Sequence, residues 1–147
     1  MNAARLAARA LELLGPHEGP IILEAPCAKR LAGAIAATSA IARSEDIPAA
    51  AVIAFLGTSA SPSERQATIG RLRDRLPAGA PVVVIDHNQP RTPWQRALSL
   101  PSLLVSGLTP ARARYPVAQE LATHGFAIRS LRLANGERFQ LVSAIRK

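Results

Sequence analysis

The strongest pattern in the chain is a continuous run of four β-branched residues, 82–85, that ends in the polar residues Asp86, His87 and Asn88. Because the run does not alternate with polar positions, both of its faces are expected to be covered, as in the central strand of a parallel sheet. The polar residues would then lie at the C-terminal end of this strand, where open α/β sheets bind their ligands.

The segments before and after this run extend the pattern into an α/β domain. An apolar stretch over 50–57 and a helical stretch over 63–76 precede the run, and together the three predict a strand–helix–strand unit. The dipeptide Asn135-Gly136 predicts a β-hairpin with a type I′ turn near the end of the chain. The remaining elements are expected to be helices over 2–14, 28–37 and 112–123, and strands over 20–25, 38–43, 126–133 and 138–145.

The segment 89–110 interrupts this regular order, since it carries four prolines. We interpret it as an insertion over the C-terminal edge of the sheet, where long loops commonly determine specificity. Two interpretations of Trp94 are open. It either belongs to a lid or a partner interface, or it only covers the edge of the sheet. Asn88, Arg91 and Trp94 are the candidates for contacts with a substrate or a partner.

Composition limits the class of protein. With 147 residues, of which 48% are hydrophobic, residues 1–147 are expected to form a single domain with a substantial core. No apolar run approaches the ~20 residues that a membrane span needs. The N-terminal stretch interleaves arginines with apolar residues, which is typical of an amphipathic helix and not of a signal peptide. The single cysteine excludes an internal disulfide and a cysteine-cluster metal site, so we expect a cytoplasmic protein without a metal.

The net charge of +8 raises the question of an anionic partner. Nucleic acid, an acidic protein and anionic lipid all fit such a charge. The positive residues are scattered, however, and only 3% of the chain is aromatic. A solvated basic surface is therefore the simpler interpretation, and nucleic-acid binding is kept as an alternative.

Three groups of residues are candidates for chemistry. His87 would act as a general base that Asp86 orients, unless the pair only caps a strand. Cys27 would be a nucleophile next to a helix N-terminus, or else a small buried filler. Glu24 would bind a cationic ligand, or it would form an ion pair with Lys29 or Arg30, which is the simpler expectation.

Three stretches of the sequence resemble the class I S-adenosylmethionine-dependent methyltransferases, namely EDIPAAAVIAFLG, RLRDRLPAGAPVVVID and RYPVAQELATHGFAIRSLRLANGERFQLVSA. The resemblance covers about residues 45–147. It implies an α/β, Rossmann-like three-layer sandwich whose mostly parallel sheet ends in an antiparallel β-hairpin. The last strand would insert antiparallel beside the strand 82–85. If S-adenosylmethionine is bound, the resemblance places it against Glu24, Asp46, Ile47 and Leu56.

The chain departs from this family at the turn after its first strand. The family has an acidic residue there and then a glycine-rich turn, because a backbone without side chains must approach the cofactor. This chain reads Glu24-Ala25-Pro26-Cys27-Ala28-Lys29-Arg30, with Pro26, Ala28 and Arg30 at the glycine positions. Pro26 removes a backbone donor, and Lys29 and Arg30 would repel the positively charged sulfonium.

A second departure is a deletion. The family's second strand ends in an acidic residue that takes the ribose hydroxyls, and a helix follows that strand. Only about twelve residues separate Arg30 from Arg43, which is too few for these elements. We therefore expect a trimmed fold that has no residue for the ribose.

These observations predict a non-catalytic methyltransferase-like domain, a pseudoenzyme with a degenerate cofactor site that acts as an interaction or regulatory subunit. No cofactor is expected in this case. The first alternative is an S-adenosylmethionine-dependent methyltransferase whose site is atypical or completed by a partner. The second alternative is an arginine-rich binder of nucleic acid or of an acidic partner. Because trimming a sheet exposes a new edge strand, we also expect a homodimer or a partner protein.

Overall fold

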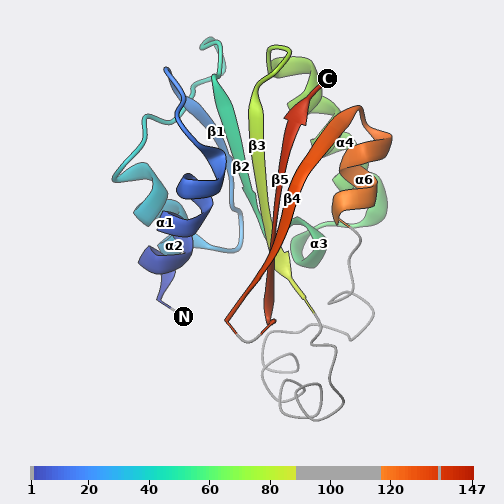
Figure 1. Cartoon of the computed structure of the whole chain (residues 1–147). Coiled ribbons are helices and arrows are strands. Elements are labelled where there is room, and N and C mark those ends of the chain that lie inside the picture. Colours follow the sequence, from blue (N-terminus) through green and yellow to red (C-terminus); the bar gives the residue numbers. More distant parts are fainter. Residues whose placement is uncertain (1, 89–116, 136) are drawn as a thin grey trace.

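Figure 1 shows the fold of the chain in a computed structural model, which describes residues 2–88, 117–135 and 137–147. The elements follow the alternating helix–strand order that the apolar pattern predicts. In chain order they are α1 (Ala3–Leu14), β1 (Ile21–Glu24), α2 (Lys29–Ala36), β2 (Ala50–Ala54), α3 (Leu56–Ser59), α4 (Pro62–Arg75), β3 (Pro81–His87), α6 (Val117–Thr123), β4 (Phe126–Ala134) and β5 (Phe139–Arg146).

The strands form one five-stranded sheet in the order β1-β2-β3-β5-β4. β1, β2 and β3 are parallel, and β5 inserts antiparallel between β3 and β4, with Val84 opposite Val142. Helices α1 and α2 cover one face of the sheet, and α4 and α6 cover the other (Figure 1). This arrangement confirms the expected Rossmann-like three-layer sandwich with a closing antiparallel hairpin.

Strand β2 is apolar at every position because each face of the sheet has its own core. Ala51 and Ile53 of β2 belong to the core beneath α4 and α6. Val52 and Ala54 point to the opposite face and belong to the core beneath α1 and α2. All five residues of β2 are buried, which explains why its sequence does not alternate.

Helix α4 is delimited by its own sequence. The Ser61 side chain accepts a hydrogen bond from the backbone N–H of Glu64, and the Glu64 carboxylate accepts one from the Ser61 N–H, which is a capping box. Arg73 and Arg75 lie in the last turn, next to the negative end of the helix dipole. Arg75 Nη2 also donates to the carbonyl oxygen of Arg43 at 2.7 Å, and this bond ties the segment before β2 to α4.

The strand expected over 38–43 is wrong in extent, because it is reduced to one parallel bridge between Ile41 and Ile21. The chain turns away directly after this bridge. Asp46 Oδ2 accepts a 2.7 Å hydrogen bond from the backbone N–H of Arg43, and the Asp46 N–H donates back to the Arg43 carbonyl. This turn ends the pairing, so the described sheet has no full strand beyond β1.

The strand expected over 50–57 is also too long. β2 ends at Ala54, Phe55 takes the left-handed conformation with φ 60° and ψ 36°, and α3 begins at Leu56. A left-handed conformation costs a residue with a side chain roughly 1–2 kcal/mol. The reversal is held by the buried Asp86, whose Oδ2 accepts a 2.6 Å hydrogen bond from the Gly57 N–H.

The expected hairpin is present, since β4 ends at Ala134 and β5 begins at Phe139. A type I′ turn needs positive φ at both Asn135 and Gly136, and residue 136 lies outside the described part, so the turn type stays a prediction. Asn135 and Glu137 both have positive φ, at 53° and 64°. The strand β4 also carries an irregularity between Ile128 and Ser130. Of the helix expected over 112–123, α6 accounts for 117–123, and residues 112–116 lie outside the described part.

Candidate functional site

A cavity lies beside the turn between β1 and α2, at the end of the sheet where the parallel strands finish. Its volume is about 600 Å³. Residues of this turn, of α1 and of the start of α2 line it, together with Phe55 and Phe139. The described lining residues are Ala3, Leu6, Pro26, Cys27, Ala28, Lys29, Arg30, Leu31, Phe55 and Phe139. We call this space the turn cavity.

Lys29 and Arg30 supply the charge of the turn cavity. Both are exposed, and neither is ion-paired with any residue in the described ranges. They occupy the first turn of α2, a helix that has no acidic residue in that turn and no side-chain cap at Ala28. Because cations are unfavourable at the positive end of a helix, this placement costs some stability and leaves a positive electrostatic potential at the cavity.

An aromatic cluster stands at one wall of the turn cavity. The ring centroids of Phe55 and His87 lie 4.8 Å apart, those of His87 and Phe139 5.2 Å, and those of Phe55 and Phe139 5.9 Å. Tilted rings at these separations attract one another. Burial lowers the pKa of His87 below its usual value, because a charged imidazolium would lose its hydration there. The imidazole is therefore neutral at neutral pH.

Asp86 joins the end of β3 to the start of α3 through a backbone hydrogen bond. The side chain is fully buried, and its Oδ2 accepts from the Gly57 N–H while its Oδ1 accepts from the backbone N–H of His87 at 2.7 Å. A carboxylate bonded to the His87 ring would raise the imidazole pKa, whereas burial lowers it. These bonds give Asp86 a structural task, and the general-base role of His87 stays a prediction.

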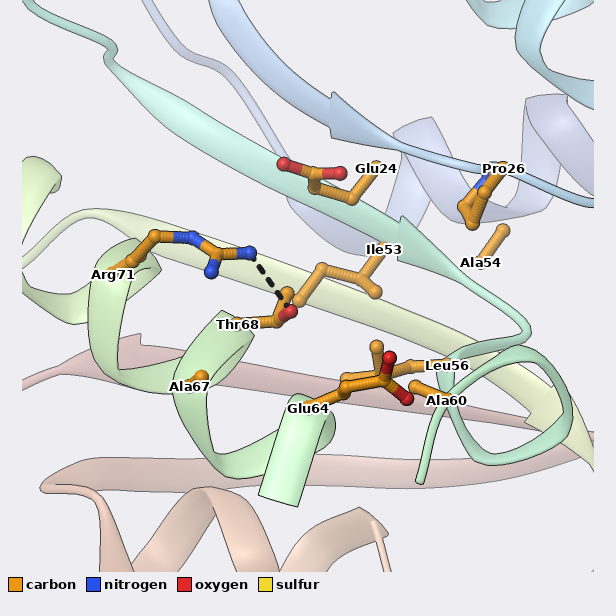
Figure 2. Close-up of a pocket in the computed structure, with 10 residues that line it drawn as sticks. All are labelled: Glu24, Pro26, Ile53, Ala54, Leu56, Ala60, Glu64, Ala67, Thr68 and Arg71. Carbon is orange, nitrogen blue, oxygen red and sulfur yellow. Dashed lines mark hydrogen bonds between the residues drawn. The ribbon is translucent and has the colours of Figure 1, made fainter. Parts of the chain in front are cut away.

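Glu24 lies on the other face of the sheet, in a separate cavity of about 350 Å³ (Figure 2). Its carboxylate and the Arg71 guanidinium both project into this space, and Arg71 Nη2 donates to the hydroxyl of Thr68 at 3.0 Å. The described lining residues are Glu24, Pro26, Ile53, Ala54, Leu56, Ala60, Glu64, Ala67, Thr68 and Arg71. We call this space the α4 cavity.

The ion pair expected between Glu24 and Lys29 or Arg30 is wrong, because these residues line different cavities and no such pair occurs in the described chain. Pro26 alone among these turn residues lines both spaces. The expectation of Cys27 as a buried filler is wrong as well, since its thiol is exposed. Cys27 lies in the turn between β1 and α2 and lines the turn cavity.

The other predicted site residues are spread over the molecule. Leu56 is buried in the core and lines the α4 cavity with Glu24. Asp46 and Ile47 belong to the turn before β2, where the Asp46 carboxylate is bonded to the Arg43 N–H and 82% of Ile47 is exposed. Neither is among the described residues that line the two cavities.

The predicted partner-contact residues are only partly described. Asn88 holds the hairpin, since its Nδ2 donates to the Glu137 carbonyl at 2.8 Å and its N–H donates to the Arg138 carbonyl at 2.8 Å. Arg91 and Trp94 lie outside the described residues. The sequence analysis did not identify Phe55 and Phe139 as site residues. A signal was available, because the chain has few aromatic residues and these two lie near the ends of predicted strands.

The described residues contain neither a candidate metal site nor a candidate membrane-spanning helix. Among residues 2–88, 117–135 and 137–147, no group of three His, Cys, Asp or Glu side chains is placed to hold a metal ion. Within the same ranges, no helix is both long enough and apolar enough to cross a membrane.

Comparisons with known proteins identify the fold. No family model and no curated protein matches the sequence. Among solved structures, the pyocyanin biosynthetic protein PhzM matches with a TM-score of 0.68 and 14% identity over 99% of this chain and 55% of its own. Human N-acetylserotonin methyltransferase, in complex with S-adenosylmethionine, matches with a TM-score of 0.62 and 13% identity over 97% of this chain and 51% of its own.

The N-methyltransferase NodS from Bradyrhizobium japonicum WM9 matches over most of both chains, with a TM-score of 0.59, 12% identity and coverage of 97% and 94%. By contrast, the chain spans only 42% of an O-methyltransferase family 2 protein from Planctomyces limnophilus, and about half of PhzM. The chain therefore has a class I methyltransferase-like fold. At these identities the likeness concerns the fold alone.

Proposed function

We propose that this chain is a non-catalytic methyltransferase-like domain that does not use S-adenosylmethionine and serves as an interaction or regulatory subunit. The observation that carries the proposal is the turn after β1, where Pro26, Lys29 and Arg30 line the turn cavity. In the family that the sequence resembles, this turn is rich in glycine so that the cofactor can approach the backbone.

The residues of this turn do not fit that cofactor. Pro26 has no N–H to donate and fixes its own φ. Lys29 and Arg30 present two unpaired cations toward the space that a sulfonium would share. Two like charges about 6 Å apart repel by roughly 0.7–1.4 kcal/mol at effective dielectric constants of about 80–40. Two such cations would weaken binding by roughly one to two orders of magnitude.

The edge of the sheet supports the same proposal. Beyond β1 the described chain has only the Ile41 bridge, so the strand that would end in a ribose-binding carboxylate is not formed. The next acidic residues are Glu45 and Asp46. The Asp46 carboxylate already accepts from the Arg43 N–H, and the Glu45 carboxylate accepts from the Ser44 hydroxyl at 2.8 Å.

One observation favours the alternative, a methyltransferase with an atypical or partner-completed site. Glu24 keeps an acidic residue at the end of β1, and N-acetylserotonin methyltransferase, a protein of the same fold, has been solved with S-adenosylmethionine. A partner chain would then have to supply the ribose contacts. We rank this alternative second because the Glu24 side chain lines the α4 cavity and not the turn cavity.

Thermal unfolding in the presence of S-adenosylmethionine tests the proposal. A ligand present at 100 times its dissociation constant stabilises a protein by about 2.7 kcal/mol, so 1 mM cofactor would reveal a site of about 10 μM. We expect no change in melting temperature. Methyltransferase activity, or a rise of several degrees that appears with the cofactor only when a partner is added, would support the alternative.

A further inference from the structure

We propose that the turn cavity binds a small anionic molecule with a flat apolar body, with its charge at Lys29 and Arg30 and its body against Phe55 and Phe139. This inference rests on the proposed function, since it needs the cavity to be free of S-adenosylmethionine. It names the class of ligand that a regulatory domain of this kind would sense.

The size and lining of the cavity define the ligand. Its volume of about 600 Å³ lies in the middle of the range for small-molecule sites, which is about 300–1,000 Å³. Apart from Lys29 and Arg30, its described side chains are apolar, with the thiol of Cys27 the most polar of them. A site that combines a large apolar surface with two cations selects a molecule that carries both an apolar body and a negative charge.

The charge in the cavity is of one sign. Lys29 and Arg30 have no ion-pair partner in the described part of the chain, and no described acidic residue lines the cavity. An arriving carboxylate, sulfonate or phosphate would therefore meet two cations that no protein carboxylate neutralises. Binding would also offset the repulsion between these cations and the positive end of α2.

The aromatic side of the cavity is preorganised. Phe55 and Phe139 both contact the His87 ring, at centroid distances of 4.8 and 5.2 Å, so neither phenyl ring is isolated. The burial that lowers the His87 pKa keeps its ring neutral, so the imidazole that contacts both phenyl rings adds no positive charge at neutral pH. Flat apolar molecules stack favourably against rings that are already fixed in place.

The α4 cavity provides a contrast within the same molecule. It is smaller, at about 350 Å³, and combines the carboxylates of Glu24 and Glu64 with the guanidinium of Arg71 (Figure 2). An anion there would face two carboxylates for one cation. The anion preference is therefore expected at the turn cavity only, and Arg71 serves as a matched control for Arg30.

The test is a titration of the full chain with 2-naphthoate, followed by calorimetry and by NMR shifts of residues near Phe55 and Phe139. Two probes separate the contributions: 2-naphthylmethylammonium keeps the flat body but reverses the charge, and acetate keeps the charge without the body. We expect 2-naphthoate to bind at least tenfold more tightly than either. The double variant Lys29→Gln/Arg30→Gln should weaken 2-naphthoate binding about tenfold, since each exposed cation contributes up to about fivefold.

The same probes provide the control and the results that would overturn the inference. Arg71→Gln should leave 2-naphthoate binding unchanged, and all variants are compared by thermal unfolding to show that they are folded. Equal binding of the anionic and cationic naphthalenes, an Arg71→Gln effect as large as that of the double variant, or no binding at millimolar 2-naphthoate would each overturn the inference.

S-adenosylmethionine is titrated in parallel to separate the two proposals. If neither S-adenosylmethionine nor 2-naphthoate binds, the anion site is overturned and the proposed function stands. Micromolar binding of S-adenosylmethionine overturns the proposed function, and with it the anion site.

Discussion

Asp86 offers the sharpest test of how the site end of the sheet is held together. Its buried carboxylate accepts from the Gly57 N–H at 2.6 Å and from the His87 N–H at 2.7 Å. The Gly57 bond links the end of β3 to the start of α3 and stabilises the left-handed turn at Phe55, while the His87 bond fixes the carboxylate at the end of β3. Replacing the carboxylate should therefore release the turn that carries the aromatic wall.

The expected magnitude follows from these contacts. Asn has the same shape as Asp but only one acceptor oxygen, so Asp86→Asn turns an amide NH₂ toward one of the two backbone N–H donors. Hydrogen bonds to charged groups contribute about 1.5–3 kcal/mol, and an unsatisfied buried donor costs a similar amount. We expect Asp86→Asn to lower the free energy of unfolding by about 2–3 kcal/mol, and Asp86→Ala to lower it by about 4 kcal/mol.

The assay is urea unfolding followed by circular dichroism, with Asp74→Asn as the matched control. Asp74 is exposed on α4, where surface substitutions usually change stability by less than about 0.5 kcal/mol. If Asp86→Asn and Asp74→Asn lose equally little stability, the buried bonds of Asp86 do not hold the turn, and the reasoning is refuted.

Three further predictions concern pH, capping and assembly. Burial lowers the pKa of His87 in the folded state, so its contribution to stability is complete above the unfolded pKa of about 6.5 and is lost as the pH falls through the lower folded pKa. In urea unfolding at a series of pH values, His87→Gln should flatten this dependence, and the control His17→Gln should keep it. Ser61→Ala removes the cap of α4 and should cost about 1 kcal/mol, measured in the same assay, and an unchanged midpoint would argue against the capping box. The trimmed sheet should self-associate, and sedimentation that shows a strict monomer at high concentration would contradict this.

The elements and their order could be predicted because they depend on local signals. The uninterrupted apolar runs at β2 and β3 require two covered faces, and the structure supplies a separate core on each. The capping residues before α4 and the Asn-Gly dipeptide of the hairpin are read directly from the sequence. The resemblance added the antiparallel insertion of β5 beside β3, which no local signal contains.

What could not be predicted depends on contacts between distant residues. The early end of β2 results from a bond between Gly57 and Asp86, which are 29 positions apart. The strand near Ile41 is reduced to a single bridge because the chain enters a tight turn there, closed by a hydrogen bond from the Arg43 N–H to the Asp46 carboxylate. The residues of this turn cannot also be extended. Glu24 and Lys29 are near in sequence but line different cavities, because Glu24 is the last residue of β1 whereas Lys29 lies beyond the following turn, in α2, which covers one face of the sheet.

The assignment of 1–147 as one domain, the cytoplasmic location and the homodimer stay predictions. So do the catalytic role of His87 and the partner contacts of Arg91 and Trp94. These depend on residues outside the described part or on molecules that a single chain does not contain.

The most direct test of the central claim is a calorimetric titration of the purified chain with S-adenosylmethionine and with its demethylated product. Human N-acetylserotonin methyltransferase, which has been solved with S-adenosylmethionine, is the positive control. We predict no binding heat for this chain up to millimolar ligand, because Pro26, Lys29 and Arg30 occupy the turn that the cofactor would approach. A dissociation constant in the micromolar range for either ligand would contradict the account.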